Sequence, residues 1–532
     1  MGASREILAE AKQRGKLRSV DPATLETIAE LDIATGAQVG EAVGRAREAA
    51  ATWSATTFAQ RARHLKNVQA WVVAHMDEIA ETISRENGKP LVEAISADVM
   101  PFVDLVSWLL SDAAEILRPE EIALDWKWTG RLSYIEWQPR GVIGIIAPWN
   151  FPFNIPAGQT AMALMAGNTV VLKPSEYTPV TGEWVARAFN EAGLPRDVVQ
   201  AMSGDGSTGA ALVEAGVNLI CFTGSVPTGK KIMAAAAGRL TPVCLELGGK
   251  APMIVCRDAN IEVASSAAVW GAFTNSGQVC ASVERLYIHE SIYQPFLDKV
   301  VEKTKQLRQG PSLPAQDNDV GPMCTLEGLE RAERQVRDAR EMGAEILTGG
   351  QRHPEHKGWF FQPTVLASVD HRFECVSAET FGPLLPVMKF HDEEEVVRLA
   401  NDSTVGLTAS IWSKDLDRAR MLASRIEAGT VMVNANVYTY AVPQTPWGGP
   451  KESGIGRTHG ALGLKEMCEP HHIHVNRTHF LKEPFWFRYS PQHAGLFKSA
   501  VRMLWGSGLG ARLKALEGLL GGIRKLPPGN QI

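Results

Sequence analysis

Residues 141–172 read GVIGIIAPWNFPFNIPAGQTAMALMAGNTVVL, a run without a single charged side chain. Its length would suit a membrane span, but Pro148, Pro152 and Pro156 remove backbone donors, and amides such as Asn150 would be costly in lipid. We therefore predict that the run folds inside a protein core, as a buried strand, a turn, a helix and a second buried strand.

The same alternation of strand and helix extends along the chain. Short apolar runs fall at 142–146, 169–172, 198–202, 219–222 and 243–245, with a helical stretch at 182–192. This rhythm predicts a doubly wound, mostly parallel sheet. A second α/β unit begins after Gly248-Gly249 and runs to about Trp447.

Bulk composition excludes several classes of function. The chain has 532 residues, which is long enough for two or more domains, and its net charge of −5 gives no basic footprint for nucleic acid. The seven cysteines are scattered and contain no C-x-x-C pair, and the first fifteen residues carry charges where a signal peptide needs an apolar core. We expect a reduced, cytoplasmic protein without a disulfide framework.

A candidate nucleophile lies in the stretch TNSGQVC, residues 274–280. Cys280 follows an apolar helical run at 263–273, where the chain breaks into a turn. A thiolate can accept an acyl group and release it again. Taken alone, one cysteine is better interpreted as a small buried hydrophobe. Cys280 gains weight from motifs elsewhere: Pro148-Trp-Asn150, Lys173-Pro-Ser-Glu176, Phe222-Thr-Gly-Ser225, Glu246-Leu-Gly-Gly-Lys250 and Glu379-Thr-Phe-Gly-Pro383.

Two glycine motifs are ambiguous by themselves. Gly204 to Gly209 satisfies G-x-G-x-x-G but lacks an acidic residue about twenty positions on, and Gly224 to Lys230 nearly matches a P-loop but is followed by Lys231 instead of Ser or Thr. Each is equally consistent with a tight turn between a strand and a helix.

In combination, these motifs resemble the aldehyde dehydrogenase superfamily of the hydrolytic type, over about residues 20–475. The resemblance implies an α/β fold with two doubly wound Rossmann-like domains, a small β arm for oligomerisation and an additional C-terminal helical extension. The expected boundaries are 1–118 with 141–247 for the cofactor-binding domain, 248–447 for the catalytic domain, 119–140 with 468–482 for the arm, and 483–532 for the tail.

The resemblance also implies the catalytic roles. Cys280 is the expected nucleophile, and Asn150 is expected to donate to the oxyanion together with the backbone N–H of Cys280. Glu246 is the expected general base that activates water on the thioester, although its position before two glycines would also suit an ordinary loop carboxylate.

The implied cofactor is NAD, with NADP left open. Gly224 and Ser225 match the turn that holds the pyrophosphate at a helix N-terminus. Lys173 and Glu176 match the residues that hold the adenosine ribose, and a carboxylate there would repel a 2′-phosphate. By resemblance, Glu379 and Phe381 hold the nicotinamide riboside. Trp149 and Ser175 complete the predicted cofactor residues.

The expected reaction is oxidation of an aldehyde to a carboxylic acid. Succinate-semialdehyde members of the family carry arginines at the positions of Gly158 and Thr274, so we expect a neutral aliphatic (medium- or long-chain) or aromatic aldehyde. An apolar tunnel lined by Phe153, Tyr438, Tyr440 and Trp447 is one hypothesis; plain core packing is the other. The alternatives are a succinate-semialdehyde or coenzyme A-acylating enzyme, and an inactive membrane-associated scaffold.

We expect no metal site. His471, His472 and His474 fall on a predicted strand, where neighbouring side chains point to opposite faces, so we interpret the segment as a strand of the oligomerising arm. The expected assembly is a homodimer or homotetramer.

The tail beyond residue 483 has an apolar stripe at helical spacing between Phe497 and Ile523, with an excess of Lys and Arg. Gly506, Gly508 and Gly510 predict two short helices instead of one. Packing of the stripe against protein is the commoner arrangement. The alternative is peripheral contact with a membrane through residues 497–525.

Overall fold

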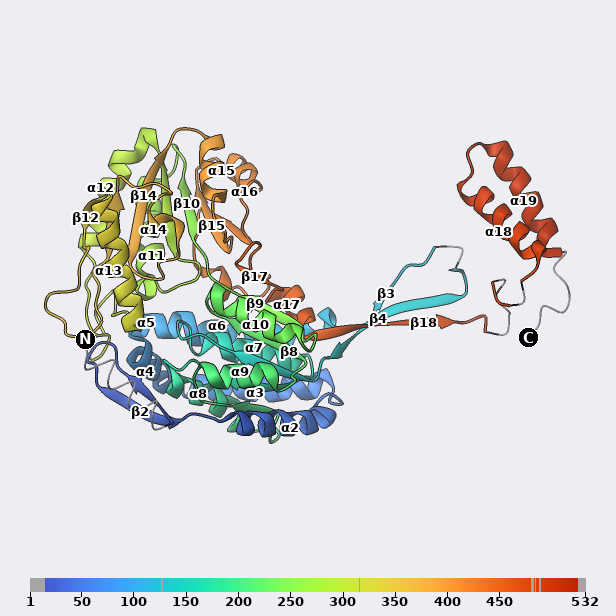
Figure 1. Cartoon of the computed structure of the whole chain (residues 1–532), viewed down its shortest axis with the longest axis horizontal. Helices are drawn as coiled ribbons and strands as arrows, with labels where there is room; N and C mark the ends of the chain where they lie inside the picture. The colour runs from blue at the N-terminus through green and yellow to red at the C-terminus, as the bar shows by residue number, and fades with distance from the viewer. Residues whose placement is uncertain are drawn as a thin grey trace. The chain divides into compact units, whose positions relative to one another are not determined.

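The computed structural model describes residues 15–125, 128–314, 316–479, 483, 485–487 and 489–524. These residues divide into two compact units, one built from the segments up to Arg118 and from Trp137 to Pro470, and one from Pro119 to Glu136 and beyond His471. The larger unit is an α/β structure with two large sheets (Figure 1). Together with the fold of its solved relatives, this confirms the predicted architecture of two Rossmann-like domains.

The first sheet has the strand order β17-β9-β8-β5-β6-β7. Its strands are β5 (Val142–Ile146), β6 (Thr169–Lys173), β7 (Val199–Ala201), β8 (Leu219–Thr223), β9 (Val243–Glu246) and β17 (Gly454–Ile455). All of these pair in parallel except β17, which is antiparallel to β9. The order reverses between β5 and β8, which is where ligands bind in open sheets of this kind.

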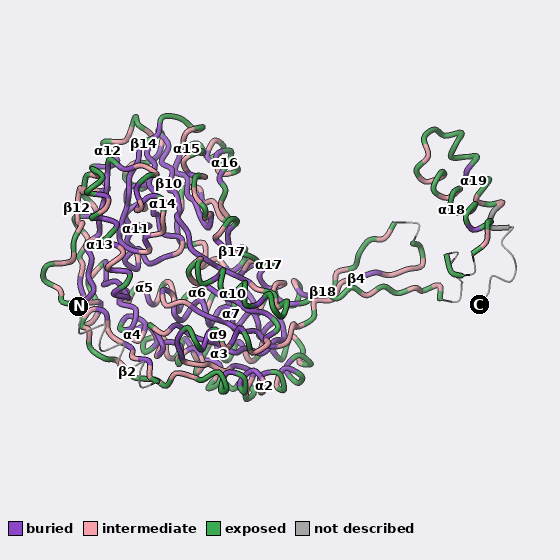
Figure 2. The backbone as a smooth tube through the Cα atoms, in the orientation of Figure 1, coloured by how far each residue is buried: buried purple, intermediate pink, exposed green. Residues whose placement is uncertain are grey.

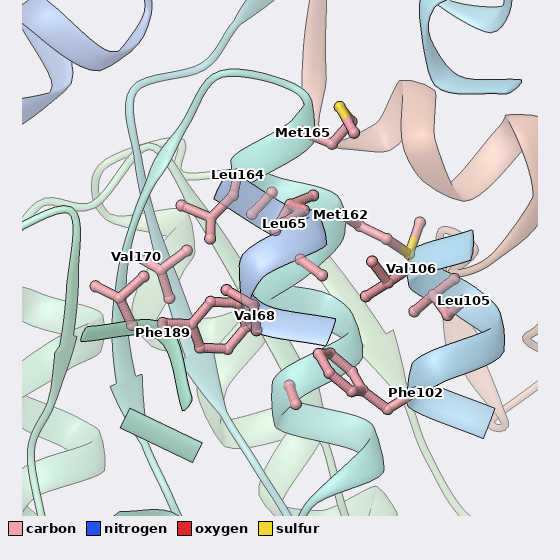
Figure 3. Close-up of a cluster of buried hydrophobic side chains, with 14 of the residues drawn as sticks. Leu65, Val68, Phe102, Leu105, Val106, Met162, Leu164, Met165, Val170 and Phe189 are labelled. Carbon is pink, nitrogen blue, oxygen red and sulfur yellow. The ribbon is translucent and has the colours of Figure 1, made fainter. Parts of the chain in front are cut away.

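Helices cover both faces of this sheet, because alternate strand residues are apolar on both sides. Ile143 and Ile145 lie in a core with α3, α6, α7 and α8, whereas Val142 and Ile146 lie in a core with α2, α9 and α10. The helices are α2 (Gly36–Trp53), α3 (Phe58–Ala74), α4 (Met76–Asn87), α5 (Leu91–Glu93), η1 (Ala94–Val99), α6 (Met100–Ile116), α7 (Asn154–Met165), α8 (Pro179–Asn190), α9 (Gly206–Glu214) and α10 (Val226–Ala237). Figure 3 shows the packing of α3, α6 and α7 around Phe102 and Met162.

The uncharged run at 141–172 forms β5, α7 and β6, as predicted, and it is almost wholly buried. A different segment, 91–116, is long and apolar enough to cross a membrane by length and composition, and half of its apolar 18-residue stretch is buried in the fold. Its main helix, α6, packs against α3 and α7. We therefore assign it to the protein core.

The second sheet has the order β12-β13-β14-β11-β10-β15-β16, with only β12 antiparallel to its neighbour. Its strands are β10 (Ala251–Val255), β11 (Val283–His289), β12 (Glu345–Thr348), β13 (Thr364–Ala367), β14 (Leu384–Phe390), β15 (Thr408–Trp412) and β16 (Thr430–Val433). Its helices are α11 (Ile261–Phe273), η3 (Thr274–Gly277), η4 (Glu290–Ile292), α12 (Tyr293–Lys305), α13 (Leu326–Glu341), α14 (Glu374–Ser377), α15 (Glu393–Asn401) and α16 (Leu416–Ala423). Figure 2 shows that the strands of both sheets are buried along most of their length.

The remaining elements of the described residues are β1 (Lys16–Val20), β2 (Thr27–Asp32), β3 (Glu120–Glu121), β4 (Arg131–Pro139), η5 (Tyr438–Ala441), α17 (Gly460–Glu466), β18 (Cys468–Asn476), α18 (Pro491–Trp505) and α19 (Leu509–Arg524). Strands β18, β4 and β3 form a three-stranded sheet, and β18 contains the predicted histidine strand. The domain boundaries and the role of this sheet as an oligomerisation arm stay predictions.

Candidate active site

A cavity of about 700 Å³ lies at the carboxyl ends of β5, β6 and β8. It contains every residue predicted for the site: Asn150, Glu246, Cys280, Trp149, Lys173, Ser175, Glu176, Gly224, Ser225, Glu379 and Phe381. These residues are spread over more than two hundred positions of sequence. The first sheet and its loops supply one wall, and the segments before β11 and β14 supply the opposite wall.

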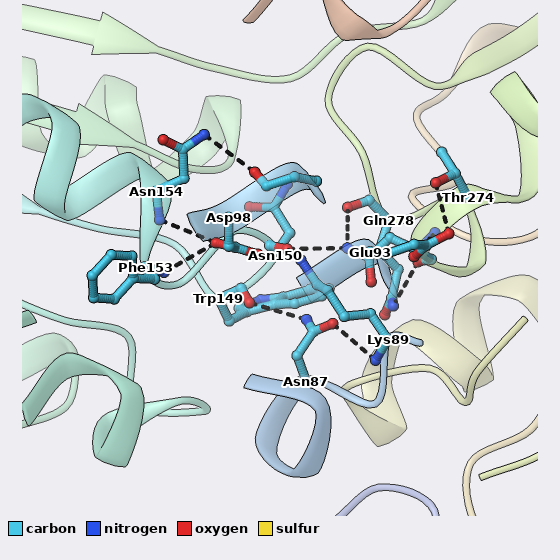
Figure 4. Close-up of polar contacts among 12 residues, drawn as sticks. Asn87, Lys89, Glu93, Asp98, Trp149, Asn150, Phe153, Asn154, Thr274 and Gln278 are labelled. Carbon is cyan, nitrogen blue, oxygen red and sulfur yellow. Dashed lines mark hydrogen bonds and ion pairs between the residues drawn. The ribbon is translucent and has the colours of Figure 1, made fainter. Parts of the chain in front are cut away.

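The turn before Cys280 has an unusual backbone. Asn275, Ser276 and Gly277 all have positive φ angles, of 49°, 56° and 73°. Glu93, at the end of α5, accepts hydrogen bonds from the Thr274 hydroxyl (2.8 Å) and the Asn275 N–H (2.9 Å), as Figure 4 shows. Left-handed conformations in residues with a Cβ persist only where the surroundings hold them, and Glu93 is one such constraint.

Cys280 itself is partly buried at the bottom of the cavity. Burial, followed by the negative charges of Glu246 and Glu379, raises the pKa of its thiol to about 12. The thiol is therefore protonated at neutral pH in the free protein, and it needs a base when it attacks.

A buried ion pair contacts the backbone of Asn150. The Lys89 ammonium donates to Asp98 (2.7 Å) and to the Asn150 carbonyl oxygen (2.7 Å). The side-chain amide of Asn275 donates to the same carbonyl oxygen (3.0 Å), which links the turn before Cys280 to the Asn150 backbone. No hydrogen bond joins the Asn150 side-chain amide to another described residue, which leaves it available to a ligand in the cavity.

Asp98 also fixes the helix that follows Asn150. It lies in the π-helix η1, and its second carboxylate oxygen accepts from the N–H groups of Phe153 (3.1 Å) and Asn154 (3.0 Å), at the start of α7. Sequence reasoning missed Lys89, Glu93 and Asp98, since each looks like an ordinary charge on a helical stretch. Their only signal is position within a segment rich in apolar residues.

Glu246 ends strand β9 and is almost completely buried. Its carboxylate accepts hydrogen bonds from the hydroxyls of Thr458 and Thr223, the second at 3.4 Å. Burial raises the pKa of Glu246 to about 7, and the two threonine hydrogen bonds oppose that rise. A carboxylate with this pKa can accept a proton at neutral pH, as a general base must.

The opposite end of the cavity is suited to a phosphate and a ribose. Helix α10 begins at Val226, and the hydroxyl of its N-cap Ser225 makes no cap to the helix backbone. The first N–H groups of a helix attract an anion. Lys173 donates to Glu176 across 2.9 Å at the end of β6. Gly206 and Gly209 of α9 also line this end, so the Gly204–Gly209 motif borders the cavity.

Glu379 and Phe381 are held by a second buried ion pair. Glu284 accepts from the backbone N–H groups of Thr380 (2.8 Å) and Phe381 (2.9 Å), and Lys250 donates to Glu284 (2.6 Å). Burial raises the pKa of Glu379 to about 7.

Apolar side chains pack around Cys280. Val279, Ala281, Leu407, Val437 and Trp447 form a cluster that packs against Phe151, Cys280 and Tyr440. The Tyr440 and Trp447 rings meet edge to face at 5.2 Å. Of the two hypotheses for Phe153, core packing holds: it precedes the first residue of α7 and packs in the core, edge to face with Phe102, whereas Phe151 packs against the cluster beside Cys280. Tyr438 is exposed outside the cluster.

Comparison with known proteins places these features in a family. The sequence model of the aldehyde dehydrogenase family matches residues 8–473. A Methylomonas protein named 4,4'-diapolycopene aldehyde oxidase is 36% identical over 92% of this chain and 91% of its own length. The betaine aldehyde dehydrogenase of Bacillus subtilis is 36% identical over 87% of this chain and 95% of its own length. An aldehyde dehydrogenase from Bacillus cereus, solved with NAD+, superposes with a TM-score of 0.82 at 33% identity, covering 87% of this chain and 93% of its own.

Proposed function

Because the chain belongs to the aldehyde dehydrogenase family, we propose that Cys280, Asn150 and Glu246 carry out the NAD(P)-dependent oxidation of an aldehyde in the cavity described above. The observation that carries this assignment is the presence of a thiol, an unpaired amide and a carboxylate with a pKa of about 7 in that one cavity.

In the proposed cycle, the Cys280 sulfur bonds to the carbonyl carbon of the aldehyde. Its thiol proton passes to a carboxylate, for which Glu246 has a suitable pKa. The former carbonyl oxygen, now negatively charged, accepts hydrogen bonds from the Asn150 amide and the Cys280 N–H; removal of one such donor costs about 10²–10³ in rate. NAD(P)+ supplies the hydride acceptor. Cys280 then holds the acyl group as a thioester.

Glu246 completes the cycle by hydrolysis. After it has released the thiol proton to solvent, it takes a proton from water, the resulting hydroxide attacks the thioester carbon, and the carboxylic acid leaves as the C–S bond breaks and the Cys280 sulfur regains a proton. The presence of this base favours water over coenzyme A as the acyl acceptor. Acid formation without added coenzyme A supports this pathway, and a strict requirement for coenzyme A contradicts it.

The cavity has the features that a nicotinamide dinucleotide needs. The open N-terminus of α10 at Gly224 and Ser225 suits the pyrophosphate, and Lys173 with Glu176 suits the adenosine ribose. Glu379 and Phe381 suit the nicotinamide ribose and ring, with the Phe381 ring edge to face against Trp149 at 5.4 Å. Glu176 favours NAD over NADP because of its negative charge.

We propose a neutral aliphatic or aromatic aldehyde as substrate. The Lys89 ammonium lies 4.2 Å from the centre of the Phe151 ring, beside the apolar cluster, but it is engaged by Asp98. Thr274 gives its hydroxyl to Glu93, so it offers no positive charge. A carboxylate-bearing aldehyde would therefore lack a partner. Steady-state kinetics test this: a much higher kcat/KM for succinate semialdehyde than for hexanal or decanal would contradict it.

The test of the catalytic assignment is NADH formation with a panel of aldehydes. Cys280→Ala is expected to lower the rate by at least about 10³-fold, as loss of a nucleophile does. Cys256→Ala is the matched control, because this buried thiol does not line the cavity. Equal losses in both variants would contradict the assignment.

For the assembly, we propose a cytoplasmic homodimer or homotetramer with peripheral membrane contact through residues 497–525. Sedimentation velocity measures the assembly, and a monomer at all concentrations would contradict it.

A further inference from the structure

The C-terminal helices form a hairpin of their own. Helix α18 ends at Trp505 and α19 begins at Leu509. The chain reverses its direction in the three residues between them, Gly506, Ser507 and Gly508 (Figure 1). Leu496 of α18 and Ala515 of α19 are buried between the helices, and a Cβ added to Gly518 would lie 2.9 Å from the Ser499 hydroxyl. These contacts define the inner faces of an antiparallel helical pair.

Both helices leave an apolar stripe exposed. On α18 the stripe is Phe497, Val501 and Trp505, spaced four residues apart, and Trp505 is 66% exposed. On α19 it is Leu509, Leu513, Leu516 and Leu520, of which Leu509 is 77% exposed. Figure 2 shows most of both helices in the colour of exposed residues. We name these seven side chains the apolar stripe of the hairpin.

The two halves of the stripe emerge on the same side of the hairpin. At about 100° per residue, Phe497 and Val501 are turned by roughly a third of a turn from Leu496, and Leu516 and Leu520 are turned by a similar angle, in the same sense, from Ala515. In helices that run in opposite directions, equal rotations from the facing line bring both sets to one side. The apolar side chains of both helices therefore emerge on one side of the hairpin, except Trp505, which is turned by about half a turn from Leu496 and points away from the partner helix.

Charge and aromatic content indicate what this surface contacts. Lys498, Arg502, Arg512 and Lys514 are exposed on the two helices, against the single acidic Glu517, although the whole chain has a net charge of −5. Exposed aromatic side chains, Phe485, Trp486, Phe487 and Tyr489, precede α18. Apolar stripes with basic flanks and interfacial Trp and Phe are typical of helices that lie in the surface of a membrane.

We propose that the hairpin docks flat on an anionic phospholipid bilayer, with the apolar stripe among the acyl chains and the basic side chains at the headgroups. This inference rests on the peripheral location proposed above, and it gives that location a defined surface and orientation.

The experiment is co-sedimentation of the full chain with vesicles of phosphatidylglycerol and phosphatidylcholine, compared with phosphatidylcholine alone. The double variant Leu513→Glu with Leu516→Glu places two charges in the apolar stripe and is expected to lower the bound fraction at least tenfold. The matched control, Leu240→Glu with Met421→Glu, makes the same change at two exposed apolar side chains outside the hairpin and is expected to bind as the native chain does.

Two further measurements separate the outcomes. Circular dichroism establishes that both variants keep their helices, and NADH formation from hexanal reports on catalysis independently of the vesicles. Equal sedimentation of the native chain and the stripe variant would overturn the proposal. The proposal would also be overturned if the native chain did not bind vesicles and the stripe variant had a different assembly mass. The apolar stripe would then contact a second copy of the chain. If the native chain does not oxidise hexanal, that result counts against the catalytic assignment and not against the proposal that the hairpin binds the membrane.

Discussion

Glu246 combines burial with two hydroxyl donors, and this combination predicts how hydrolysis depends on pH. A general base works in its deprotonated form, so the rate of thioester hydrolysis should rise as pH increases through about 7, the pKa of this carboxyl. Single-turnover hydrolysis of the acyl-enzyme measures this step directly. Thr458→Val should shift the rise to higher pH by roughly one unit, because the lost hydrogen bond had favoured the carboxylate.

The conservative variant decides whether the Thr458 hydroxyl is responsible. Thr458→Ser keeps the donor and should restore the native pH profile, whereas a simple packing defect would lower the rate at every pH. An unchanged profile in Thr458→Val would show that this hydroxyl does not set the pKa of Glu246.

The carboxylate of Glu176 predicts the choice of cofactor. Glu176→Gln keeps a hydrogen-bonding group beside Lys173 but removes the negative charge that opposes a 2′-phosphate. We expect the ratio of kcat/KM for NADP to that for NAD to rise about tenfold, which corresponds to ~1.4 kcal/mol. Glu183→Gln changes an exposed carboxylate that does not line the cavity and should leave the ratio unaltered. A tenfold rise in both variants would point to a general charge effect instead.

At this scale, the predictable residues are those with a local motif. Cys280 follows Gly-Gln at the end of an apolar helix, and Glu246 precedes two glycines at the end of a strand, so each lies in a recognisable motif whose role the other motifs of the chain then indicate. Lys89 and Asp98 were not predictable, because their roles depend on contacts with Asn150 and with α7 that lie more than fifty positions away.

Among the elements, the turn at Gly248-Gly249 connects the two sheets and passes close to the nucleophile. A Cβ added to Gly249 would lie 2.2 Å from the Cys280 carbonyl oxygen, which is closer than real atoms approach. Gly249→Ala must therefore displace the Cys280 backbone, and misplacement of a reacting group by about 1 Å can cost about 10²-fold in rate. We expect a loss of that size in NADH formation.

The matched variant is Gly44→Ala, on helix α2, where an added Cβ meets nothing within 4 Å. It should leave the activity unchanged and stabilise the chain slightly, by up to about 1 kcal/mol, because alanine is the better helix former. Native activity in Gly249→Ala would mean that the turn adjusts freely and does not position Cys280.

Elements with a strong pattern were predictable, and those made by long-range pairing were not. The apolar runs of β5 and β6 are the clearest case, since short β-branched apolar runs bounded by Gly, Pro and Asn favour buried strands. Strand β17 has two residues, Gly454 and Ile455, and exists only through its pairing with β9. Phe151 and Phe153 show the same limit, because the apolar pattern cannot tell which ring enters the core and which lies beside Cys280.

For the whole molecule, the cavity is formed by loops from both large sheets. Ser225 and Glu176 extend from the first sheet, whereas Glu379 and Phe381 belong to the segment before β14 of the second. A ligand that touches both walls must be released before either sheet unfolds. NAD at 100 times its dissociation constant should therefore stabilise the native state by about 2.7 kcal/mol.

Thermal unfolding measures this linkage. For a chain of this size, unfolding entropy scales with length, so 2.7 kcal/mol corresponds to a rise of about 2.4 °C in the midpoint. Cys280→Ala should show the full rise, because the thiol reacts with the aldehyde and not with the cofactor. Lys173→Met with Glu176→Met removes both proposed ribose partners and should show less than half of it at the same NAD concentration. An equal rise in the double variant would place the adenosine end elsewhere, and no rise in the native chain would contradict NAD binding in this cavity.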